Sequence, residues 1–510
     1  MLLLLITGAL VMLLVWDYGR RSLRLHFFER SKISGPVSIP ILGNGLQALF
    51  FRPENYIQKF GDYFNKYGKT FRLWVLGECL VYTTDLKYFE AILSSGTLLK
   101  KAHLYRFLDD FLGDGILLST GHKWTSRRKA LAPAFHFKCL ENFVEIMDRN
   151  SGIMVEKLKK VADGKTSVDL FKYVSLEALD VITETAMGIQ VNAQSDPNCP
   201  YTKALKSVVY IESNRLASVS QRYDWLFPIA APFVYRRLQR DIRLMQDFTD
   251  KVIRERRAIL EQSKADGSYR PIIMGDEETG KKSKMALLDI LLQATVDNKP
   301  LTNKDIREEV DVFIFAGDDT TTSGVSHALH VISRHPRVQK CIYEELVSVL
   351  GQDPDAPVTQ AKLLELKYLD CVVKETMRLH PPVPILGRFL PKDLQVGDKV
   401  IPGNTSILLM PYYVYRDPEY FPDPLTFKPE RWLNGKEAST VPFTYIPFSS
   451  GPKNCVGQKF ANLQLKTLIS KVIRHYELLP LGEDLKPTYT FILSSSSGNH
   501  VGLMPRKKVN

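Results

Sequence analysis

One cysteine near the carboxyl end constrains the fold of this chain more than any other residue. Cys455 stands between Gly451 and Gly457, and Lys453 places a cation two residues before it. A thiol binds a metal only as the thiolate, and backbone amides, a helix N-terminus and a nearby cation all favour that charged form. Apolar residues recur at helical spacing over residues 460–473, so a helix with its positive end toward the cysteine is expected next. The pattern predicts a loop that holds a metal-bound thiolate.

The ten residues from Phe448 to Gly457 resemble the haem-binding loop of the cytochrome P-450 superfamily. The phenylalanine, the glycine Gly451, the basic residue Lys453, the cysteine and the second glycine all stand in the expected places. By that resemblance Cys455 is the axial ligand of a haem iron whose opposite position is free to activate oxygen. The other cysteines show no paired spacing for zinc or disulfides, which favours a reducing compartment.

The longest helical pattern runs from Thr302 to His335. Thr302 and Asp305 form a capping-box arrangement at its start, and Pro336 lies just beyond its end. At 1.5 Å per residue such a helix spans about 50 Å, enough to cross a whole domain. Residues 316–321 in its middle are small, polar and acidic, which predicts a local loosening where a threonine hydroxyl competes for a backbone carbonyl.

Residues 316–321 resemble the oxygen-binding groove of the superfamily. The resemblance implies that Ala316 and Gly317 lie against the haem, and that Thr320 hydrogen-bonds the oxygen species on the iron. Asp319 would relay solvent protons toward that oxygen. A solvated acidic face of a helix is the alternative interpretation.

A carboxylate and a guanidinium, Glu375 and Arg378, lie three residues apart and therefore on one face of a helix that ends before Pro381. Surface pairs of this kind are common and contribute only about 0–1 kcal/mol. Arg431 follows downstream and ahead of the cysteine loop, in the order found in the superfamily. By that resemblance the three residues form a buried structural triad that supports the haem pocket.

Haem carries two propionates, which need cations or strong donors in a buried site. Trp124 and Arg128 stand four residues apart on an expected helix, where the superfamily also has a tryptophan and an arginine. Arg388, on an extended stretch after the Glu375 helix, is a second candidate cation, and Lys453 is a third. Most members of the superfamily carry arginine at this last position, so Lys453 is expected to neutralise charge without a bidentate fork.

The resemblance covers nearly the whole chain, and residues 118–124, 132–137 and 308–311 are similar to insect members of the fourth family. Many fourth-family enzymes carry a glutamate before the groove glycine, where it esterifies a haem methyl, and a histidine after that glycine. This chain has Ala316 and Asp318. Alanine has no nucleophile and Asp318 points about 200° around the helix from it, so haem b without covalent attachment is expected.

The first residues differ in kind from the rest. Met1–Trp16 is almost uninterrupted apolar sequence, slightly short for a bilayer span of roughly 20 residues. Basic residues follow this run instead of preceding it, which favours a membrane anchor over a cleaved signal. We expect residues 1–34 to form an anchor with a basic stop-transfer segment in the endoplasmic reticulum membrane, with the body facing the cytosol. Residues 35–510 would form a single haem-thiolate catalytic domain.

Helical periodicity dominates the body, with a minor β component. Alternation over residues 70–82 about a Gly-Glu pair predicts a β-hairpin, and residues 489–493 with 500–503 predict a second one. The charged stretch 263–284 is typical of a solvated loop. We therefore expect a mainly α fold with a minor sheet, the cytochrome P-450 fold. Haem would be buried between the groove helix and the cysteine loop with its following helix.

The net charge of +12 and the pI near 9.1 do not indicate nucleic-acid binding, because no recognition module or basic aromatic platform is present. An NADPH-dependent flavoprotein reductase, or a cytochrome b-type donor, would instead be steered by cations on the thiolate side of the haem. Solubilising charge is the alternative role of these cations. Those expected near that side are Lys123, Arg127, Lys129, Lys138, Lys453 and Lys459.

Together these features predict a haem-thiolate monooxygenase that inserts one oxygen atom from O2 into a lipophilic substrate with electrons from NADPH. Fatty acids, hormones and foreign compounds are the substrate classes that the resemblance allows. A haem-thiolate isomerase or dehydratase acting on peroxides and a non-enzymatic haem sensor stay open as alternatives, although neither requires an intact proton relay. The expected substrate contacts are residues 105–118, Phe313, Ala316, residues 383–386 and residues 492–493.

Overall fold

The computed structural model describes residues 1–48, 51–75, 77–218, 220–221, 223–266, 286–433 and 440–506. Helices make up most of these residues and the strands are short, which confirms the mainly α fold with a minor sheet. The charged stretch 263–284 lies largely outside the described residues, and its first part ends a helix at Ala265.

The helices, in chain order, are α1 (Leu2–Arg30), α2 (Gly45–Ala48), α3 (Tyr56–Tyr67), α4 (Leu86–Leu93), α5 (Asp109–Leu112), α6 (Gly121–Leu131), α7 (Phe137–Leu158), α8 (Leu170–Met187), α9 (Pro200–Ala217), α10 (Phe227–Ala230), α11 (Pro232–Ala265), α12 (Leu287–Gln293), α13 (Asn303–Ser333), α14 (Pro336–Leu350), α15 (Gln360–Glu365), α16 (Lys367–Leu379), α17 (Pro411–Val414) and α18 (Gln458–His475). Short 3-10 helices are η1 (His103–Leu108), η2 (Ala132–Phe135), η3 (Lys159–Val161) and η4 (Pro429–Trp432). The strands are β1 (Thr70–Val75), β2 (Glu78–Thr83), β3 (Val168–Asp169), β4 (Thr295–Val296), β5 (Lys299–Pro300), β6 (Leu386–Leu390), β7 (Leu394–Val396), β8 (Lys399–Ile401), β9 (Thr405–Leu409), β10 (Tyr476–Leu479), β11 (Pro487–Thr490), β12 (Ile492–Ser495) and β13 (His500–Pro505).

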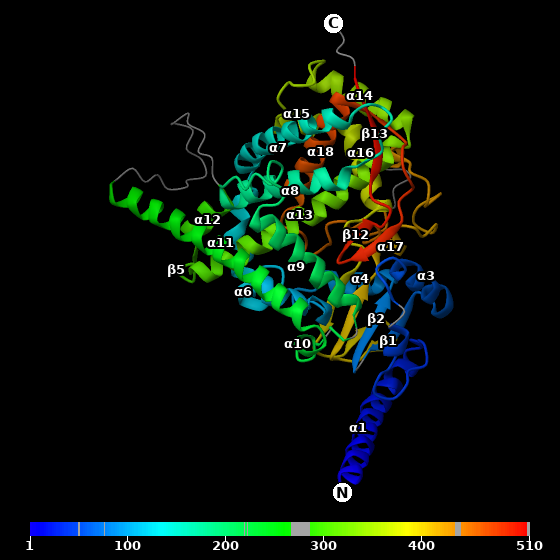
Figure 1. Ribbon diagram of the computed structural model, residues 1–510. Helices are drawn as coiled ribbons and strands as arrows, with labels where there is room; N and C mark the ends of the chain where they lie inside the picture. The colour runs from blue at the N-terminus through cyan, green and yellow to red at the C-terminus, as the bar shows by residue number, and fades with distance from the viewer. Residues whose placement is uncertain are drawn as a thin grey trace.

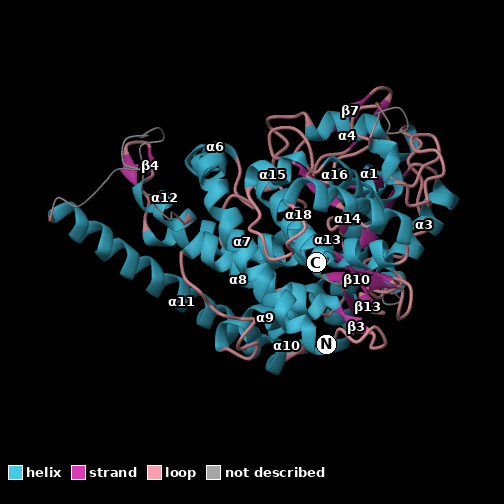
Figure 2. Ribbon diagram, turned by 90° about the horizontal axis from the view of Figure 1, so that it is seen from above, coloured by secondary structure: helices cyan, strands magenta, loops and turns pink. Residues whose placement is uncertain are grey.

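Helix α13 runs through the middle of the helical part and contacts α8, α11, α16 and α18 (Figures 1 and 2). The predicted capping box fixes its start. The Asp305 amide donates to Thr302 Oγ1 at 3.1 Å, and the Thr302 amide donates to Asp305 Oδ2 at 3.1 Å. The helix ends at Ser333, ahead of Pro336, so the predicted long helix is confirmed.

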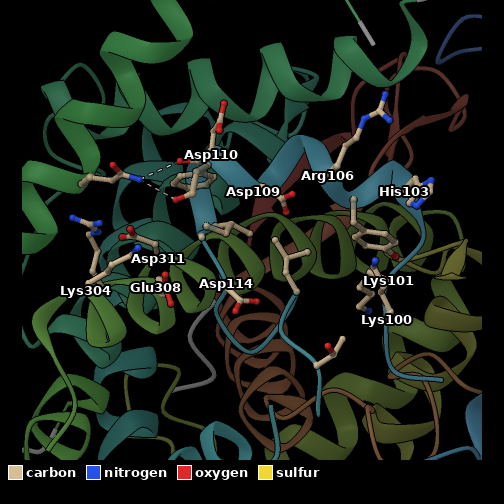
Figure 3. Close-up of a pocket in the computed structure, with 18 of the residues that line it drawn as sticks. Lys100, Lys101, His103, Arg106, Asp109, Asp110, Asp114, Lys304, Glu308 and Asp311 are labelled. Carbon is tan, nitrogen blue, oxygen red and sulfur yellow. Dashed lines mark hydrogen bonds between the residues drawn. The ribbon is translucent and has the colours of Figure 1, made fainter. Parts of the chain in front are cut away.

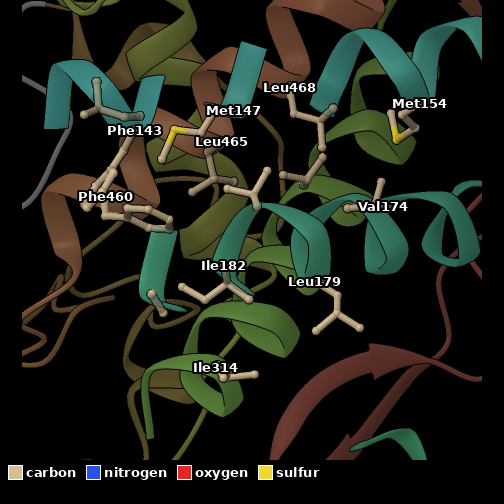
Figure 4. Packing of buried hydrophobic residues seen from close by; sticks show 14 of the residues in the cluster. Phe143, Met147, Met154, Val174, Leu179, Ile182, Ile314, Phe460, Leu465 and Leu468 are labelled. Atoms are coloured by element: carbon tan, nitrogen blue, oxygen red, sulfur yellow. The ribbon is translucent and has the colours of Figure 1, made fainter. Parts of the chain in front are cut away.

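The main apolar core packs around α13, where side chains of α7, α8, α13 and α18 meet (Figure 4). Ile182, Ile314 and Leu465 are buried there, and full burial of such a side chain contributes roughly 1.5–3 kcal/mol. Gly317 allows α8 to come close, because a Cβ at this position would lie 2.6 Å from Ile182 Cδ1. Gly317 therefore packs against α8, and its place against the haem stays a prediction.

The strands form small separate sheets. β1 and β2 pair as the predicted hairpin, and with β9 and β6 they form a four-stranded sheet in the order β1-β2-β9-β6. The predicted hairpin between residues 489–493 and 500–503 is wrong. Phe491 adopts φ 62° and reverses the chain, so β11 pairs with β12 instead. β13 pairs with β10 and β3 in another sheet.

Helix α1 projects from the end of the molecule that carries the four-stranded sheet (Figure 1). It is joined to the body at its carboxyl end, where Ser31 Oγ donates to the Val400 carbonyl at 2.8 Å. Several apolar side chains of its first half are exposed, among them Leu4, Leu5, Met12, Val15 and Trp16. Within the described part of the chain, no helix combines the length and the apolar character that crossing a membrane requires.

A fully buried ion cluster joins α16 to the segment that leads into the cysteine loop. Glu375 accepts hydrogen bonds from Arg378 Nη2 at 2.8 Å and from Arg431 Nε at 2.9 Å. Trp432 Nε1 adds a third donor at 2.9 Å, which sequence reasoning had not assigned to the cluster. Burial alone would raise the pKa of Glu375, but the hydrogen bonds and charges of the two arginines hold it below its ordinary value. The structure thus brings the predicted triad together.

We predict that Glu375→Gln destabilises the fold by about 3–5 kcal/mol, because two buried guanidinium groups lose their carboxylate. Urea unfolding followed by tryptophan fluorescence measures this loss. Glu430→Gln is the matched control, since the Glu430 side chain nearby is 31% exposed, and it should cost less than about 1 kcal/mol. Equal losses in the two variants would contradict a special role for the cluster.

Candidate active site

The cysteine loop, residues 448–457, is closed by its own backbone. The Cys455 amide donates to the Phe448 carbonyl at 2.9 Å. Gly451 lies in the left-handed region with φ +70°, and a Cβ there would lie 1.8 Å from the Leu93 carbonyl oxygen. Both the backbone angle and the neighbouring chain therefore require glycine at this turn.

The Cys455 side chain lies just ahead of α18, whose N-cap is Gly457. Among the six cysteines, all of which lie in described segments, Cys455 alone is exposed. Desolvation by the surrounding protein raises the pKa of its thiol, whereas the Gly457 amide and the charges of Arg128 and Lys101 lower it. The Gly457 amide from the loop and the two cations from other segments thus favour a thiolate, and coordination to a metal removes the thiol proton.

Helix α6 places Trp124 and Arg128 one turn apart beside this loop. Trp124 is buried. Arg128 donates to the Asn454 carbonyl at 3.1 Å and to Asn454 Oδ1 at 2.6 Å. Burial lowers the pKa of Arg128, and the nearby Cys455 raises it. Arg128 therefore fixes the residue next to the cysteine in space.

Three more cations lie close enough to one another to repel. Arg388 is buried on β6 and donates to the Gly387 carbonyl at 3.0 Å. Burial, and then the charges of Arg388 and Lys453, lower the pKa of Lys101 well below its ordinary value. Burial and Arg388 lower the pKa of Lys453 to about 7. Within the described residues no carboxylate forms an ion pair with Lys101 or Arg388, so this set fits a dianionic ligand such as the two propionates of haem.

Lys101 is a cation that sequence reasoning missed. It belongs to no recognisable motif, and only its neighbour Lys100 marks the position as basic. Its ammonium lies over the Tyr105 ring, 5.0 Å from the centroid. The fold, not the local sequence, brings Lys101 close enough for its charge to lower the pKa of Cys455.

Ala316 and Thr320 lie one turn apart on α13. Thr320 Oγ1 donates to the Ala316 carbonyl at 2.7 Å, which is the predicted competition for a backbone carbonyl. The helix nevertheless continues without interruption, so the predicted local loosening does not break it. Ala316 is exposed and Thr320 is partly exposed, which leaves both accessible to a ligand.

Asp318 lies on the other side of α13. Its side chain is buried, and its Oδ1 has no hydrogen-bond partner among the described residues. Burial and the neighbouring Asp319 raise the pKa of Asp318 well above its ordinary value. Burial raises the pKa of Asp319 to about 6, against the charge of Lys206 on α9. The environment of Asp318 thus favours its protonated form, while the pKa of Asp319 lies in the range that suits proton transfer.

A cavity of about 800 Å³ lies between η1, α5 and the first turns of α13 (Figure 3). Tyr105, Phe111 and Leu118 line it, so the predicted substrate segment 105–118 forms part of its wall. Figure 3 shows basic side chains at one end and mostly carboxylates at the other. The basic group is Lys100, Lys101, His103 and Arg106, and the carboxylates are Asp109, Asp110, Asp114, Glu308 and Asp311.

Other predicted substrate contacts lie elsewhere. Phe313 stacks on Phe135 with ring centroids 5.7 Å apart, and Leu493 is fully buried. Neither of them lines this cavity, and nor does Cys455. Lys101 belongs to both places, because it lines the cavity and its charge also lowers the pKa of the Cys455 thiol.

The cations predicted to steer a redox partner differ in how far their side chains are exposed to solvent. Lys129, Lys138 and Lys459 are exposed near the cysteine loop and α6. Arg127 is only 5% exposed and Lys453 only 8%, so the prediction that these two present charge to a partner is wrong. Both are held inside by contacts between distant segments, which local sequence does not reveal.

Comparison with known proteins agrees with the site. A family model described as Cytochrome P450 matches residues 33–501. "Probable cytochrome P450 4d21" of Drosophila melanogaster is 80% identical over 503 residues, with 98% of each chain covered. "Probable cytochrome P450 4d20" of the same species is 64% identical over 507 residues, with 99% of each covered, and "Cytochrome P450 4d2" is 44% identical over 503 residues, with 98% of each covered. The chain therefore belongs to the cytochrome P450 family and is a haem-thiolate monooxygenase of the insect fourth family.

Proposed function

We propose that this enzyme inserts one atom of O2 into a lipophilic small molecule, with electrons that originate on NADPH and arrive through a flavoprotein reductase. A cytochrome b-type protein is an alternative donor. The observation that carries the proposal is the surroundings of Cys455, where an amide and two cations favour the thiolate. Bound haem would supply the oxygen chemistry, and thiolate ligation favours O–O cleavage.

The residues of the chain itself would hold the haem and deliver protons. Cys455 would bind the iron, and Trp124, Arg128, Arg388 and Lys453, joined by Lys101, would face the propionates. Thr320 is placed to hold a proton at Oγ1, and the raised pKa of Asp319 supports its proposed part in the relay. Membership of the family supports a lipophilic substrate, with fatty acids, hormones and foreign compounds as the candidate classes. Tyr105, Phe111, Leu112 and Leu118, which lie between the charged ends of the cavity, would contact the hydrocarbon part of that substrate.

We also propose that residues 1–34 anchor the protein in the endoplasmic reticulum membrane and that residues 35–510 form the catalytic domain on the cytosolic side. The support is the apolar run Met1–Trp16 and the basic residues that follow it. Exposed Lys129, Lys138 and Lys459 support docking of an acidic reductase close to the cysteine loop.

The haem b is proposed to be held without a covalent bond to the protein. Ala316 has no nucleophile, and Asp318 is buried against α8 and α9, away from the accessible side of α13. This departure from many fourth-family enzymes leaves more room above the iron, which suits substrates larger or differently oriented than a fatty acid chain end.

The monooxygenase proposal predicts NADPH oxidation that depends on a reductase and on substrate, with product formed in proportion. Thr320→Ala should keep most NADPH oxidation but form at least about tenfold less product per NADPH, with hydrogen peroxide in its place, because proton delivery is impaired. Oxygen uptake, peroxide and product are measured together over a panel of lipophilic compounds.

Ser326→Ala is the matched control for Thr320→Ala, since it removes a hydroxyl from a buried position of the same helix with no proposed part in proton transfer. Turnover of a peroxide substrate without reductase would instead favour the isomerase alternative. Haem binding without any substrate-dependent NADPH oxidation would favour the sensor.

Non-covalent attachment predicts that acidified organic solvent extracts essentially all haem from the wild-type protein. Ala316→Glu should leave a substantial fraction of haem on the polypeptide after turnover, because a carboxylate is then present where fourth-family enzymes carry one. Haem staining of denaturing gels measures the fraction. Ala316→Gln, which has a similar size and no carboxylate, should stay fully extractable, and retention of haem by the wild type would contradict the proposal.

A further inference from the structure

Residues 99–119, here called the strap, cross one side of the 800 Å³ cavity and include η1 and α5 (Figure 3). The inner face of the strap contributes apolar side chains to the cavity lining, among them Tyr105, Phe111, Leu112 and Leu118. The way in which the strap is held therefore decides how a ligand enters the cavity.

Lys453 fastens the two ends of the strap together. Its Nζ donates to the Leu99 carbonyl at 3.1 Å and to the Ser119 carbonyl at 2.7 Å. These are the first and last residues of the strap, and the lysine belongs to the cysteine loop. The strap therefore leaves and rejoins the body at one point, and opening would involve the residues between these two ends.

The later part of the strap is bound to α13 by a buried carboxylate, whereas its middle is held by Gln246 of α11, whose Nε2 donates to the Asp110 carbonyl at 3.2 Å. Glu309 Oε2 accepts from the Ile116 amide at 3.0 Å, and both residues are buried. Glu309 Oε1 has no hydrogen-bond partner among the described residues, and the nearest cation is Arg127, whose Nε lies 3.8 Å away. The main polar bond of Glu309 is thus the one to the strap.

Two glycines let the strap lie directly on α13. A Cβ at Gly115 would lie 2.7 Å from the Glu308 carbonyl oxygen and 2.9 Å from Val312 Cγ2, and a Cβ at Gly113 would meet the Glu308 side chain at 2.8 Å. Beside this contact, Lys123 Nζ lies 3.1 Å from Asp114 Oδ2 on the strap and 3.0 Å from Glu308 Oε2 on the helix.

We propose that Glu309 is a positioning residue that latches the strap to α13, and that release of its bond to the Ile116 amide admits ligands to the haem side while Lys453 keeps the strap ends together. This role rests on the proposed function only in taking the ligand to be the substrate. Loop opening of this kind commonly limits entry and release in enzymes. It also gives a physical role to residues 308–311, which the proposed chemistry does not use.

The test compares Glu309→Leu with Glu309→Gln in the haem-loaded, full-length protein. Leucine removes the acceptor at similar volume, whereas glutamine retains an oxygen for the Ile116 amide. Glu309→Leu should speed hydrogen exchange of residues 109–118 by about tenfold or more and should raise the association rate of 4-phenylimidazole several-fold. Imidazole itself, which is smaller, should be affected less. Glu309→Gln should stay within about twofold of wild type.

Glu344→Leu is the control for the same chemical change, because Glu344 is an exposed residue of α14. Exchange and azole binding that do not change in Glu309→Leu, or that change equally in Glu309→Gln, would overturn the proposal. Neither readout needs substrate or reductase, so its failure is separate from failure of the proposed function.

Gly115→Ala gives an independent test if Glu309→Leu does not fold with haem. The added methyl group cannot fit against the Glu308 carbonyl, so it should lift the strap and produce the same faster exchange and faster 4-phenylimidazole binding. Gly96→Ala is its control, because nothing lies within 4 Å of a Cβ there. An unchanged Gly115→Ala variant would count against the latch.

Discussion

A thiolate at Cys455, which haem ligation would require, is the charge that the rest of the site would have to accommodate. The surrounding protein disfavours that charge, so the Gly457 amide, Arg128 and Lys101 have to compensate for the lost solvation. These groups come from α18, from α6 and from the strap, which are far apart in the sequence. The hydrogen bonds from Arg128 to Asn454, across 326 residues, hold α6 against the residue next to the cysteine.

The cations beside this sulfur couple haem binding to the stability of the fold. Burial and then the charge of Arg388 lower the pKa of both Lys101 and Lys453. Neither Lys101 nor Arg388 has a carboxylate in an ion pair among the described residues. A dianionic ligand would relieve that repulsion and would stabilise the folded state in proportion to its affinity. The Glu375 cluster acts differently, because its charges are already satisfied and it fixes the approach to the cysteine loop whether or not haem is bound.

Sequence patterns correctly predicted the features that depend only on neighbouring residues. The capping box of α13 and the β1–β2 hairpin each depend on a few adjacent residues, and the structure has both. Pairing at the carboxyl end was mispredicted because an apolar run does not reveal that Phe491 adopts a positive φ. The choice of β10 as partner for β13 depends on contacts between distant strands.

The burial and contacts of side chains were harder to predict than the positions of helices and strands. Lys101 was missed and Arg127 was placed on the surface, because a charged residue on a short segment carries no local sign of burial. Gly317 fits a groove motif, yet in this chain its lack of a side chain serves the contact with Ile182. The roles that family resemblance assigns to Thr320, Asp319 and the propionate cations remain predictions, and the geometry described here shows which atoms would carry them.

Thiolate ligation by Cys455 is the claim on which the other assignments depend, and the carbon monoxide difference spectrum of the reduced protein tests it most directly. We expect the full-length protein in membranes to show the absorption band near the wavelength that names the superfamily, and Cys455→Ala in the same membranes to lack it. A well-folded, haem-loaded wild-type protein without that band would mean that Cys455 does not bind the iron.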